Sequence, residues 1–300
     1  MASGVDAPVN PAATTAERRA LQQITTADGR FAVIAADHGQ PLVDMLDALG
    51  APSTPEAQRA FKADLVDTVG RRASAVLLDP DVSLPEIVDR NLLARDVGLL
   101  VRIEADGHAT EDGLRRSGLI PRLGAAGARA LGATAAKVMV FVRADREDLD
   151  GGTARMVRAA LEDCRRADLL CVMELMTYRL DDESPEAFGA RRENLVVEGA
   201  VLLQECGAMV LKLEYPGSPA ACGRLTDALD VPWAVLSAGV DHDAFRDQLR
   251  DAMDGGADGF IAGRSLWKEA VGRPAPERRR FLDEVAGRRM EELLALVDGR

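Results

Sequence analysis

Lysine is scarce in this chain, and its scarcity is informative. The sequence has 37 basic side chains, of which only Lys62, Lys137, Lys212 and Lys268 are lysines. A sequence that uses arginine wherever any cation suffices marks a lysine as a candidate for work that arginine cannot do, such as losing a proton and attacking a carbonyl carbon. Lys137 and Lys212 lie inside apolar runs, whereas Lys62 and Lys268 lie on amphipathic segments and are predicted to be solvated surface residues.

Cysteine and histidine are also few. No two of the 4 cysteines have C-x-x-C spacing, which argues against a zinc ribbon or a redox pair. The 3 histidines are scattered and do not share the face of one helix as ligands of a metal would. We therefore expect neither a metal nor another cofactor.

Long apolar runs are missing as well. None approaches the roughly 18 to 20 residues that span a bilayer, and the N-terminus lacks the apolar core of a signal peptide. The chain carries 37 basic against 49 acidic side chains, for a formal net charge of −12, and such a field repels polyanions. These absences predict a cytoplasmic protein with neither a membrane nor a nucleic acid as its partner.

Short apolar runs, by contrast, recur along the chain between amphipathic segments of helical spacing. They are rich in valine, isoleucine and leucine and lack the alternation of a half-solvated strand, as expected for parallel strands buried on both faces. The runs occupy residues 31–37, 74–80, 98–104, 136–142, 169–176, 208–215, 232–239 and 258–264. Strand and helix thus alternate throughout, which predicts an α/β protein with a single (β/α)8 TIM barrel. A doubly wound open sheet is the main alternative, but ADHGQP follows the first run instead of G-x-G-x-x-G.

No linker or low-complexity segment divides the chain. Residues 1–15, rich in alanine, proline, threonine and valine, are predicted to form a flexible tail, and residues 16–300 to form the barrel. Residues 16–25 are expected to make a short helix that covers the barrel floor.

The C-terminal ends of barrel strands point their side chains into the mouth, and here these ends are unusually polar. They carry Asp37-His38, Asp79, Glu104, Lys137, Glu174, Lys212 and Glu214. Because a buried unpaired charge is costly, charges converging on one end indicate a functional site more than a core.

Two lysines at these ends are candidates for chemistry. Lys212 lies between leucines in MVLKLEYP, where desolvation and a nearby ammonium group lower a lysine pKa and favour a nucleophilic amine. Lys137 lies two strands away, where the two ammonium groups would lower each other's pKa, and Glu174 lies between them in position to move protons. The alternative left open is that both lysines are halves of buried ion pairs, with Glu174 or Asp37 as the counter-charge.

Glycine-containing turns follow the seventh and eighth runs, in LSAGVDHDAF and FIAGRSLW. Barrel loops at these positions commonly bind phosphate through backbone N–H groups, and Arg264 would add a charge-assisted hydrogen bond. His38 is expected either to touch substrate or to be a bystander. His242 is predicted to lie on the surface, in the first turn of a helix.

A family resemblance is carried by the blocks VLLDPDVSLPEI, KVMVFV, LKLEYP, LSAGVDHDAF and GFIAGRSLW, in this order. From about residue 20 to about residue 272 the chain resembles the class I aldolases that comprise tagatose-1,6-bisphosphate aldolase and sulfofructose-phosphate aldolase. LKLEYP, PWAVLSAGVD and AGRSLW, and the short connection between the sixth and seventh runs, are most similar to the sulfofructose-phosphate branch.

The resemblance implies a role for each candidate residue. Lys212 would be the Schiff-base lysine, Lys137 a second active-site lysine, Glu174 the carboxylate for proton transfer and Asp37 the first-strand aspartate of the family. The residues implied to hold the phosphate of the dihydroxyacetone phosphate half are Ser237, Gly239, Gly263 and Arg264.

One departure concerns the first strand. Where the family has Asp-Gln-Arg, this chain has Asp37-His38-Gly39, so the arginine is missing. The family's arginine would suit an anionic group at the far end of the substrate. We therefore expect a changed aldehyde partner, one that is uncharged or held by Arg102, Arg115 or Arg143.

Taken together, the sequence predicts a class I aldolase that cleaves a ketose 1-phosphate, of the sulfofructose 1-phosphate or tagatose 1,6-bisphosphate type, to dihydroxyacetone phosphate and an aldehyde. A non-covalent sugar-phosphate isomerase or epimerase is the enzymatic alternative, and a barrel that only binds sugar phosphate is the non-catalytic one. The expected partner is a small sugar phosphate, and the expected assembly is a homo-oligomer.

Overall fold

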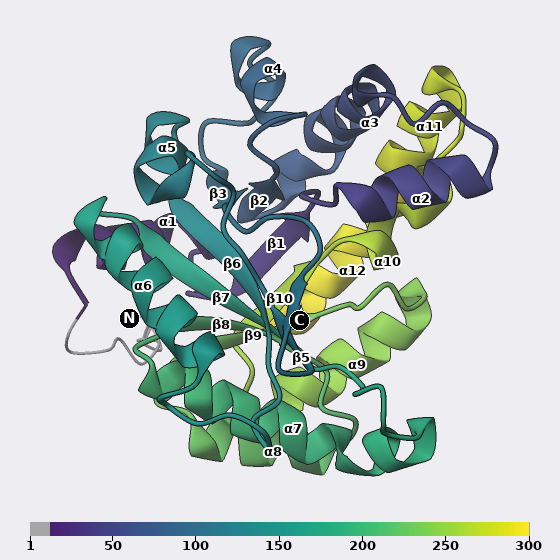
Figure 1. Ribbon diagram of the computed structural model, residues 1–300. Coiled ribbons are helices and arrows are strands. Elements are labelled where there is room, and N and C mark those ends of the chain that lie inside the picture. Colours follow the sequence, from purple (N-terminus) through teal and green to yellow (C-terminus); the bar gives the residue numbers. More distant parts are fainter. Residues whose placement is uncertain (1–12, 300) are drawn as a thin grey trace, which may run out of the picture.

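A closed barrel of parallel strands forms the centre of the molecule, as the computed structural model of residues 13–299 shows (Figure 1). Around the barrel the strands follow the order β1-β10-β9-β8-β7-β6-β3-β2. Their bounds are β1 Phe31–Ala35, β2 Ala75–Leu78, β3 Gly98–Arg102, β6 Ala135–Phe141, β7 Leu170–Met176, β8 Val210–Glu214, β9 Trp233–Leu236 and β10 Gly259–Ala262. Each predicted apolar run overlaps one of these strands, and β6 begins one residue before its run. The prediction of a single (β/α)8 barrel is confirmed.

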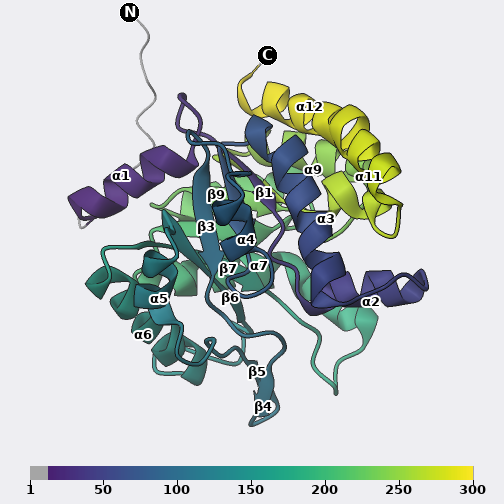
Figure 2. The same cartoon turned by 90° about the horizontal axis from the view of Figure 1, so that it is seen from above.

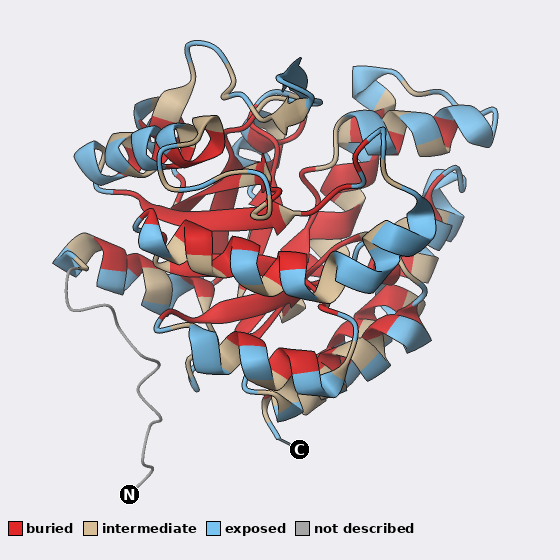
Figure 3. Ribbon diagram, turned by 60° about the horizontal axis from the view of Figure 1, so that its bottom comes forward, coloured by how far each residue is buried: buried red, intermediate tan, exposed pale blue. Residues whose placement is uncertain are grey.

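Helices cover the outside of the barrel, and most of them have one buried and one exposed face (Figure 3). Several begin at a serine or threonine cap followed by proline, a combination that satisfies a free N–H group and fixes the first turn. The helices are α1 Thr15–Ile24, α2 Gln40–Ala48, α3 Pro55–Thr68, α4 Leu84–Asp89, α5 Gly124–Ala130, α6 Gly152–Arg166, α7 Pro185–Glu205, α8 Pro219–Ala228, α9 His242–Asp254, α10 Arg264–Trp267, α11 Ala275–Phe281 and α12 Gly287–Val297. Among residues 13–299, none is both long and apolar enough to cross a membrane.

The predicted floor helix is present as α1 (Figure 2). Its buried Ala20 and Ile24 join the apolar cluster that fills the barrel interior. Gly98, at the start of β3, allows this close approach, since a Cβ atom there would lie 2.5 Å from the carbonyl oxygen of Gln23. Thr15 already belongs to α1, whereas residues 1–12, most of the predicted tail, lie outside the described residues.

Charges replace apolar side chains near the barrel mouth because strand side chains alternate. The inner cluster contains one apolar residue on each of six strands that is followed, two positions later, by a charged one. These pairs are Ala35 and Asp37, Leu77 and Asp79, Leu100 and Arg102, Ala135 and Lys137, Val172 and Glu174, and Val210 and Lys212. The apolar interior therefore ends in a layer of charges.

A small antiparallel hairpin after β3 was not predicted. Its strands, β4 Ala109–Glu111 and β5 Leu114–Arg116, project beyond the barrel (Figure 2). Asp112 and Gly113 form its turn with φ values of 51° and 75°. An Asp-Gly pair suits this turn, so the dipeptide was the signal that could have revealed the hairpin.

Two surface predictions were wrong. Lys62 on α3 is only 1% exposed and forms an ion pair with Asp79, which follows β2. The same carboxylate accepts hydrogen bonds from Ser83 Oγ and from backbone N–H groups, so the pair anchors α3 against the barrel. His242 is also buried, with its Nε2 2.9 Å from Glu292 of α12.

We expect Lys62→Met to lower the free energy of unfolding by about 3–5 kcal/mol, because the Asp79 carboxylate would keep a buried charge without its cation. Urea unfolding measures the change. Arg90→Met is the matched control: its pair with Glu86 is exposed, and its loss should cost less than about 1 kcal/mol. Equal costs in the two variants would show that the Lys62 pair does not stabilise the fold.

Candidate active site

The ammonium group of Lys137 is the centre of the charged layer. Its Nζ lies 2.8 Å from Asp37 Oδ2 and 2.9 Å from Glu174 Oε2, and it donates a further hydrogen bond to Glu104 Oε1. All four side chains are buried. One cation thus joins the ends of β1, β3, β6 and β7.

Glu174 links this cluster to the second lysine. Its other oxygen, Oε1, lies 2.8 Å from Lys212 Nζ, so one carboxylate bridges Lys137 and Lys212. Lys212 is 5% exposed and Glu174 8% exposed, which places their contact at the boundary between the network and the mouth. The sequence left two alternatives open, a reactive amine and a buried ion pair. The contact between Lys212 and Glu174 is compatible with both.

The expectation that the two ammonium groups lower each other's pKa was wrong for Lys137. Burial acts to lower the pKa of Lys137, but Asp37, Glu104 and Glu174 outweigh burial and raise this pKa well above its usual range. Lys137 is therefore a fixed positive charge.

The carboxylates around Lys137 differ in their ionisation. Burial acts to raise the pKa of Asp37 and of Glu174, but Lys137 and Lys212 outweigh it and lower both values below their usual range. Glu104 behaves differently, because burial, with Asp37 and Glu174 adding to it, raises its pKa to about 7 against the attraction of Lys137. Its second oxygen, Oε2, is buried and has no hydrogen-bond partner among the described residues.

A small cavity of about 80 Å³ opens beside Lys212. Every predicted site residue lines it except Asp37 and Lys137, which lie behind Glu174 in the ion-pair network. The predicted residues in its wall are His38, Glu174, Lys212, Ser237, Gly239, Gly263 and Arg264. The structure thus gathers in one place residues from the first, fifth, sixth, seventh and eighth predicted runs.

The part of the cavity wall formed by Arg264 and by the turn after β9 is suited to an anion. Ala238 and Gly239 after β9 both have positive φ, 47° and 81°, so this turn takes a conformation in which glycine is favoured. Arg264 borders the turn so closely that a Cβ atom on Gly239 would lie 3.1 Å from its Cζ, and its Nε is buried without a partner among the described residues. Gly263 leaves similar room, since a Cβ atom there would lie 2.8 Å from His38 Cε1.

His38 is a neutral wall of this cavity. Burial lowers its pKa to about 3, with Arg264 and Lys212 adding to the effect and Asp37 opposing it. Its ring lies edge-on to Trp267, with ring centroids 5.2 Å apart. A neutral imidazole here can accept or donate one hydrogen bond without adding charge.

Two polar strand ends do not join the network. Asp79 pairs with Lys62 outside the barrel, and Glu214 pairs with Arg192 of α7 at 3.0 Å and accepts a hydrogen bond from the backbone N–H of Thr177. Within residues 13–299 no group of three or more His, Cys, Asp and Glu side chains is arranged to hold a metal ion.

Comparison with known proteins identifies the family. The profile described as DeoC/LacD family aldolase matches residues 32–269, which include all strands of the barrel. The chain belongs to this aldolase family. It is therefore an enzyme, a carbon–carbon lyase.

Named relatives and solved structures resemble the aldolase over most of its length. Tagatose 1,6-diphosphate aldolase 2 of Enterococcus faecalis is 25% identical, with 86% of this chain and 85% of the relative covered, and the Lactococcus lactis tagatose 1,6-diphosphate aldolase is 23% identical, with 86% of each covered. Fructose-bisphosphate aldolase of Plasmodium falciparum has the same fold, with a TM-score of 0.70 at 15% identity over 95% of this chain and 94% of its own. A Schiff-base-forming fructose-1,6-bisphosphate aldolase gives a TM-score of 0.60 at 18% identity over 93% and 98%.

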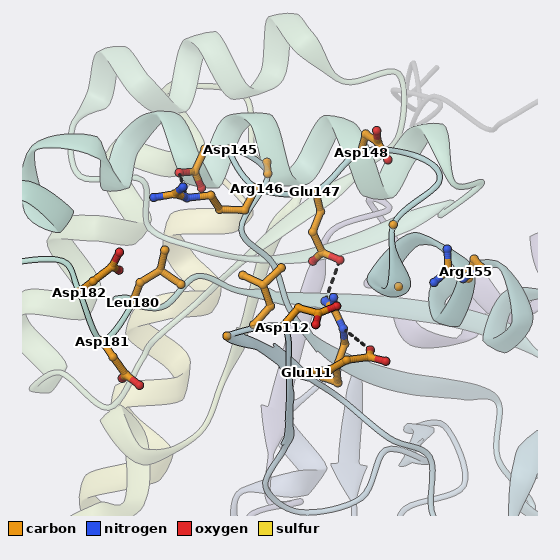
Figure 4. A pocket seen from close by; sticks show the side chains of 16 residues that line it. Glu111, Asp112, Asp145, Arg146, Glu147, Asp148, Arg155, Leu180, Asp181 and Asp182 are labelled. Carbon is orange, nitrogen blue, oxygen red and sulfur yellow. Dashed lines mark hydrogen bonds and ion pairs between the residues drawn. The ribbon is translucent and has the colours of Figure 1, made fainter.

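A larger groove lies beside the mouth of the aldolase, between the β4–β5 hairpin and the loops after β6 and β7 (Figure 4). Its volume is about 1040 Å³, and Arg116 crosses it with ion pairs of 3.1 Å to Glu111 and 2.7 Å to Glu147. None of the predicted site residues lines this groove. Lys212 lines the small cavity and Lys137 lies behind it, so the size of a hollow does not mark the candidate site here.

Glu104 gives a prediction about pH. Below about pH 4.5, its ordinary pKa, the carboxyl is protonated in both the folded and the unfolded chain. As the pH rises towards about 7 the unfolded chain releases this proton first, so the folded state loses stability relative to a variant that cannot titrate. From about pH 5 to about pH 8 we expect the wild type to lose on the order of 1–3 kcal/mol relative to Glu104→Gln.

Urea unfolding of the two proteins at several pH values measures this difference. Glu277→Gln, at an exposed position of α11, is the control for removing a carboxyl from the surface. If the difference between Glu104→Gln and the wild type is the same at every pH, the carboxyl of Glu104 is not perturbed in the folded state.

Proposed function

We propose that this aldolase cleaves a ketose 1-phosphate to dihydroxyacetone phosphate and an aldehyde through a Schiff base on Lys212. The observation that carries the proposal is the cavity beside Lys212, which has an amine and a carboxylate on one wall and the unpaired Nε of Arg264 on another. A substrate with a ketone next to its phosphate group could place the ketone carbon at Lys212 and the phosphate at Arg264.

The names of similar proteins support the substrate class. The curated relatives described above are tagatose 1,6-diphosphate aldolases, and one structure of the same fold is that of a Schiff-base-forming fructose-1,6-bisphosphate aldolase. Membership in an aldolase family favours carbon–carbon cleavage over the isomerase and the non-catalytic alternatives. The sulfofructose-phosphate branch, dihydroxyacetone phosphate as a product and a homo-oligomeric assembly stay predictions.

The first half of the reaction forms the imine. Lys212 passes a proton to Glu174, and its lone pair attacks the ketone carbon to give a carbinolamine. Glu174 returns the proton to the carbinolamine hydroxyl, which leaves as water, and a protonated imine remains. The 2.8 Å contact between Lys212 Nζ and Glu174 Oε1 is short enough for both transfers.

The second half breaks the carbon–carbon bond. A carboxylate, Glu174 in this proposal, takes the proton of the hydroxyl on C4, and the electron pair of the C3–C4 bond moves into the protonated imine. The aldehyde leaves and an enamine stays on Lys212. Protonation of the enamine carbon and hydrolysis by one water then release dihydroxyacetone phosphate and restore the amine.

Lys137 and Asp37 act behind these groups. Lys137 keeps its proton, and its charge holds Glu174 as a carboxylate that points one oxygen at Lys212. Asp37 balances part of that charge at 2.8 Å. The phosphate would lie between Arg264 and the backbone around Ser237, Gly239 and Gly263, with His38 beside it.

Trapping tests the covalent step. Incubation with dihydroxyacetone phosphate and sodium borohydride should reduce the imine to a stable adduct, and intact and peptide mass spectrometry should place it on Lys212. The chain has few lysines, so the assignment is direct. Lys212→Met should give no adduct and no turnover while remaining folded. A folded wild type that forms no adduct, yet melts at a higher temperature with phosphate ligands, would favour a non-covalent enzyme.

Arg264→Met tests the phosphate site. Loss of a charge-assisted hydrogen bond costs about 1.5–3 kcal/mol, so KM for a ketose 1-phosphate should rise about 10- to 100-fold. Arg90→Met is the control, because Arg90 pairs with Glu86 of α4 and does not line the cavity. An Arg264 variant whose KM stays within about threefold of the wild type contradicts the assignment.

A further inference from the structure

The order of strands fixes the direction in which a bound substrate must run. Arg264 and the proposed phosphate turn follow β10 and β9, and β3 lies four places from β9 around the ring of strands, directly across the barrel. Lys212 on β8 lies between these two sides. A ketose 1-phosphate held at both its phosphate and its carbonyl carbon therefore extends its far end towards β3.

Arg102 is the cation at that end. It follows the inward-facing Leu100 by two positions and pairs in register with Lys137 on β6, so it lies in the charged layer. The residue is 8% exposed, and its Nε is buried with no hydrogen-bond partner among the described residues. A nearly buried guanidinium with an unused donor is an incomplete interaction, because buried polar groups are normally satisfied.

Asp106 pairs with the guanidinium group of Arg102. Its Oδ1 accepts a hydrogen bond from Arg102 Nη1, and its Oδ2 lies 3.4 Å from Nη2. Unlike its partner, the Asp106 side chain is about half exposed, at 49%, and it lies on the loop after β3. Such a carboxylate can move into water and leave the fork of Arg102 to a phosphate or sulfonate group, which matches the same geometry.

The same pair fills the space next to Gly39, the position at which the first-strand arginine is missing. A Cβ atom on Gly39 would lie 2.6 Å from Asp106 Oδ2. Asp106 is therefore an obstacle to a side chain there. Arg102, the partner of Asp106, thus places a positive charge beside Gly39, where the arginine of the family is missing.

The other two arginines considered from the sequence fit less well. Arg143 is fully buried, and its nitrogens already contact Asp145 at 2.9 Å, Glu183 at 2.8 Å and the carbonyl oxygen of Tyr178 at 3.0 Å. Arg115 lies on the hairpin, stacked over Tyr178 and over Phe141, four residues further along β6 than Lys137. Lys137 and Phe141 are about 13 Å apart along β6, so Arg115 lies at the rim of the barrel mouth.

We propose that Arg102 binds the anionic group at the far end of the substrate and that Asp106 is the group it displaces. This inference rests on the proposed cleavage of a ketose 1-phosphate, and it makes the preferred substrate a ketose with a second anionic group on its terminal carbon. It selects Arg102 from the three arginines and excludes an uncharged aldehyde partner.

The test compares kcat/KM for a ketose 1,6-bisphosphate with kcat/KM for the matching ketose 1-phosphate, with tagatose and fructose backbones. The wild type should prefer the bisphosphate. Arg102→Met should lower the ratio of the two values about 10- to 100-fold, mainly through KM, and Arg102→Lys by less. Asp106→Asn should raise the ratio severalfold, since the competing charge is removed. Arg115→Met, the matched control, should leave the ratio within about threefold of the wild type.

The opposite signs for Arg102 and Asp106 separate substrate binding from a structural role, because loss of a structural ion pair would change both variants in the same direction. A wild type that prefers the monophosphate overturns the inference, as does a loss that falls on Arg115→Met instead of Arg102→Met. Borohydride trapping with dihydroxyacetone phosphate needs no far-end group. If the adduct forms and the ratio is insensitive to Arg102, only this inference fails, whereas absence of the adduct in the wild type removes the proposed function and the inference with it.

Discussion

The ion pairs of Lys137 are the interaction on which the rest of the site depends. Asp37, Glu104 and Glu174 come from three different strands and converge in the barrel interior, where their mutual repulsion would be large without a cation. Lys137 supplies it from a fourth strand, and Glu174 extends the network to Lys212 on β8. Five strand ends are thereby held in one arrangement, and the position of the Lys212 amine follows from it.

The same network gives its two lysines different surroundings. Lys137 is surrounded on three sides by carboxylates, so its proton is retained. Among the described residues, Lys212 has one carboxylate at hydrogen-bond distance, and it lines the cavity. The two lysines therefore suit the different tasks proposed for them, and the charge of Lys137 helps to hold the pKa of the shared Glu174 below its usual range.

Most of the fold and much of the proposed site could be predicted from the sequence because both follow from the period of a buried parallel strand. Once Val172 and Val210 are known to face inward, Glu174 and Lys212 must also face inward two positions later. Lys62 could not be predicted in this way. An amphipathic helix shows which face is polar, but not that Asp79, 17 residues after Lys62, lies against it. The pKa direction of Lys137 was missed for a related reason: it depends on Glu104 and Asp37 both reaching the same ammonium group, which only the register of the strands determines.

The scarcity of lysine has a physical reason at Lys137. An ammonium group donates up to three hydrogen bonds in three directions, and the three carboxylates around Lys137 use that geometry. The planar fork of arginine presents its donors in one plane and suits a single flat acceptor, which is how Arg102 meets Asp106. The proposed reaction gives a separate reason at Lys212, because it needs an amine that can lose its proton. In a chain rich in arginine, a lysine is thus retained at Lys137 because the shape of the charge matters.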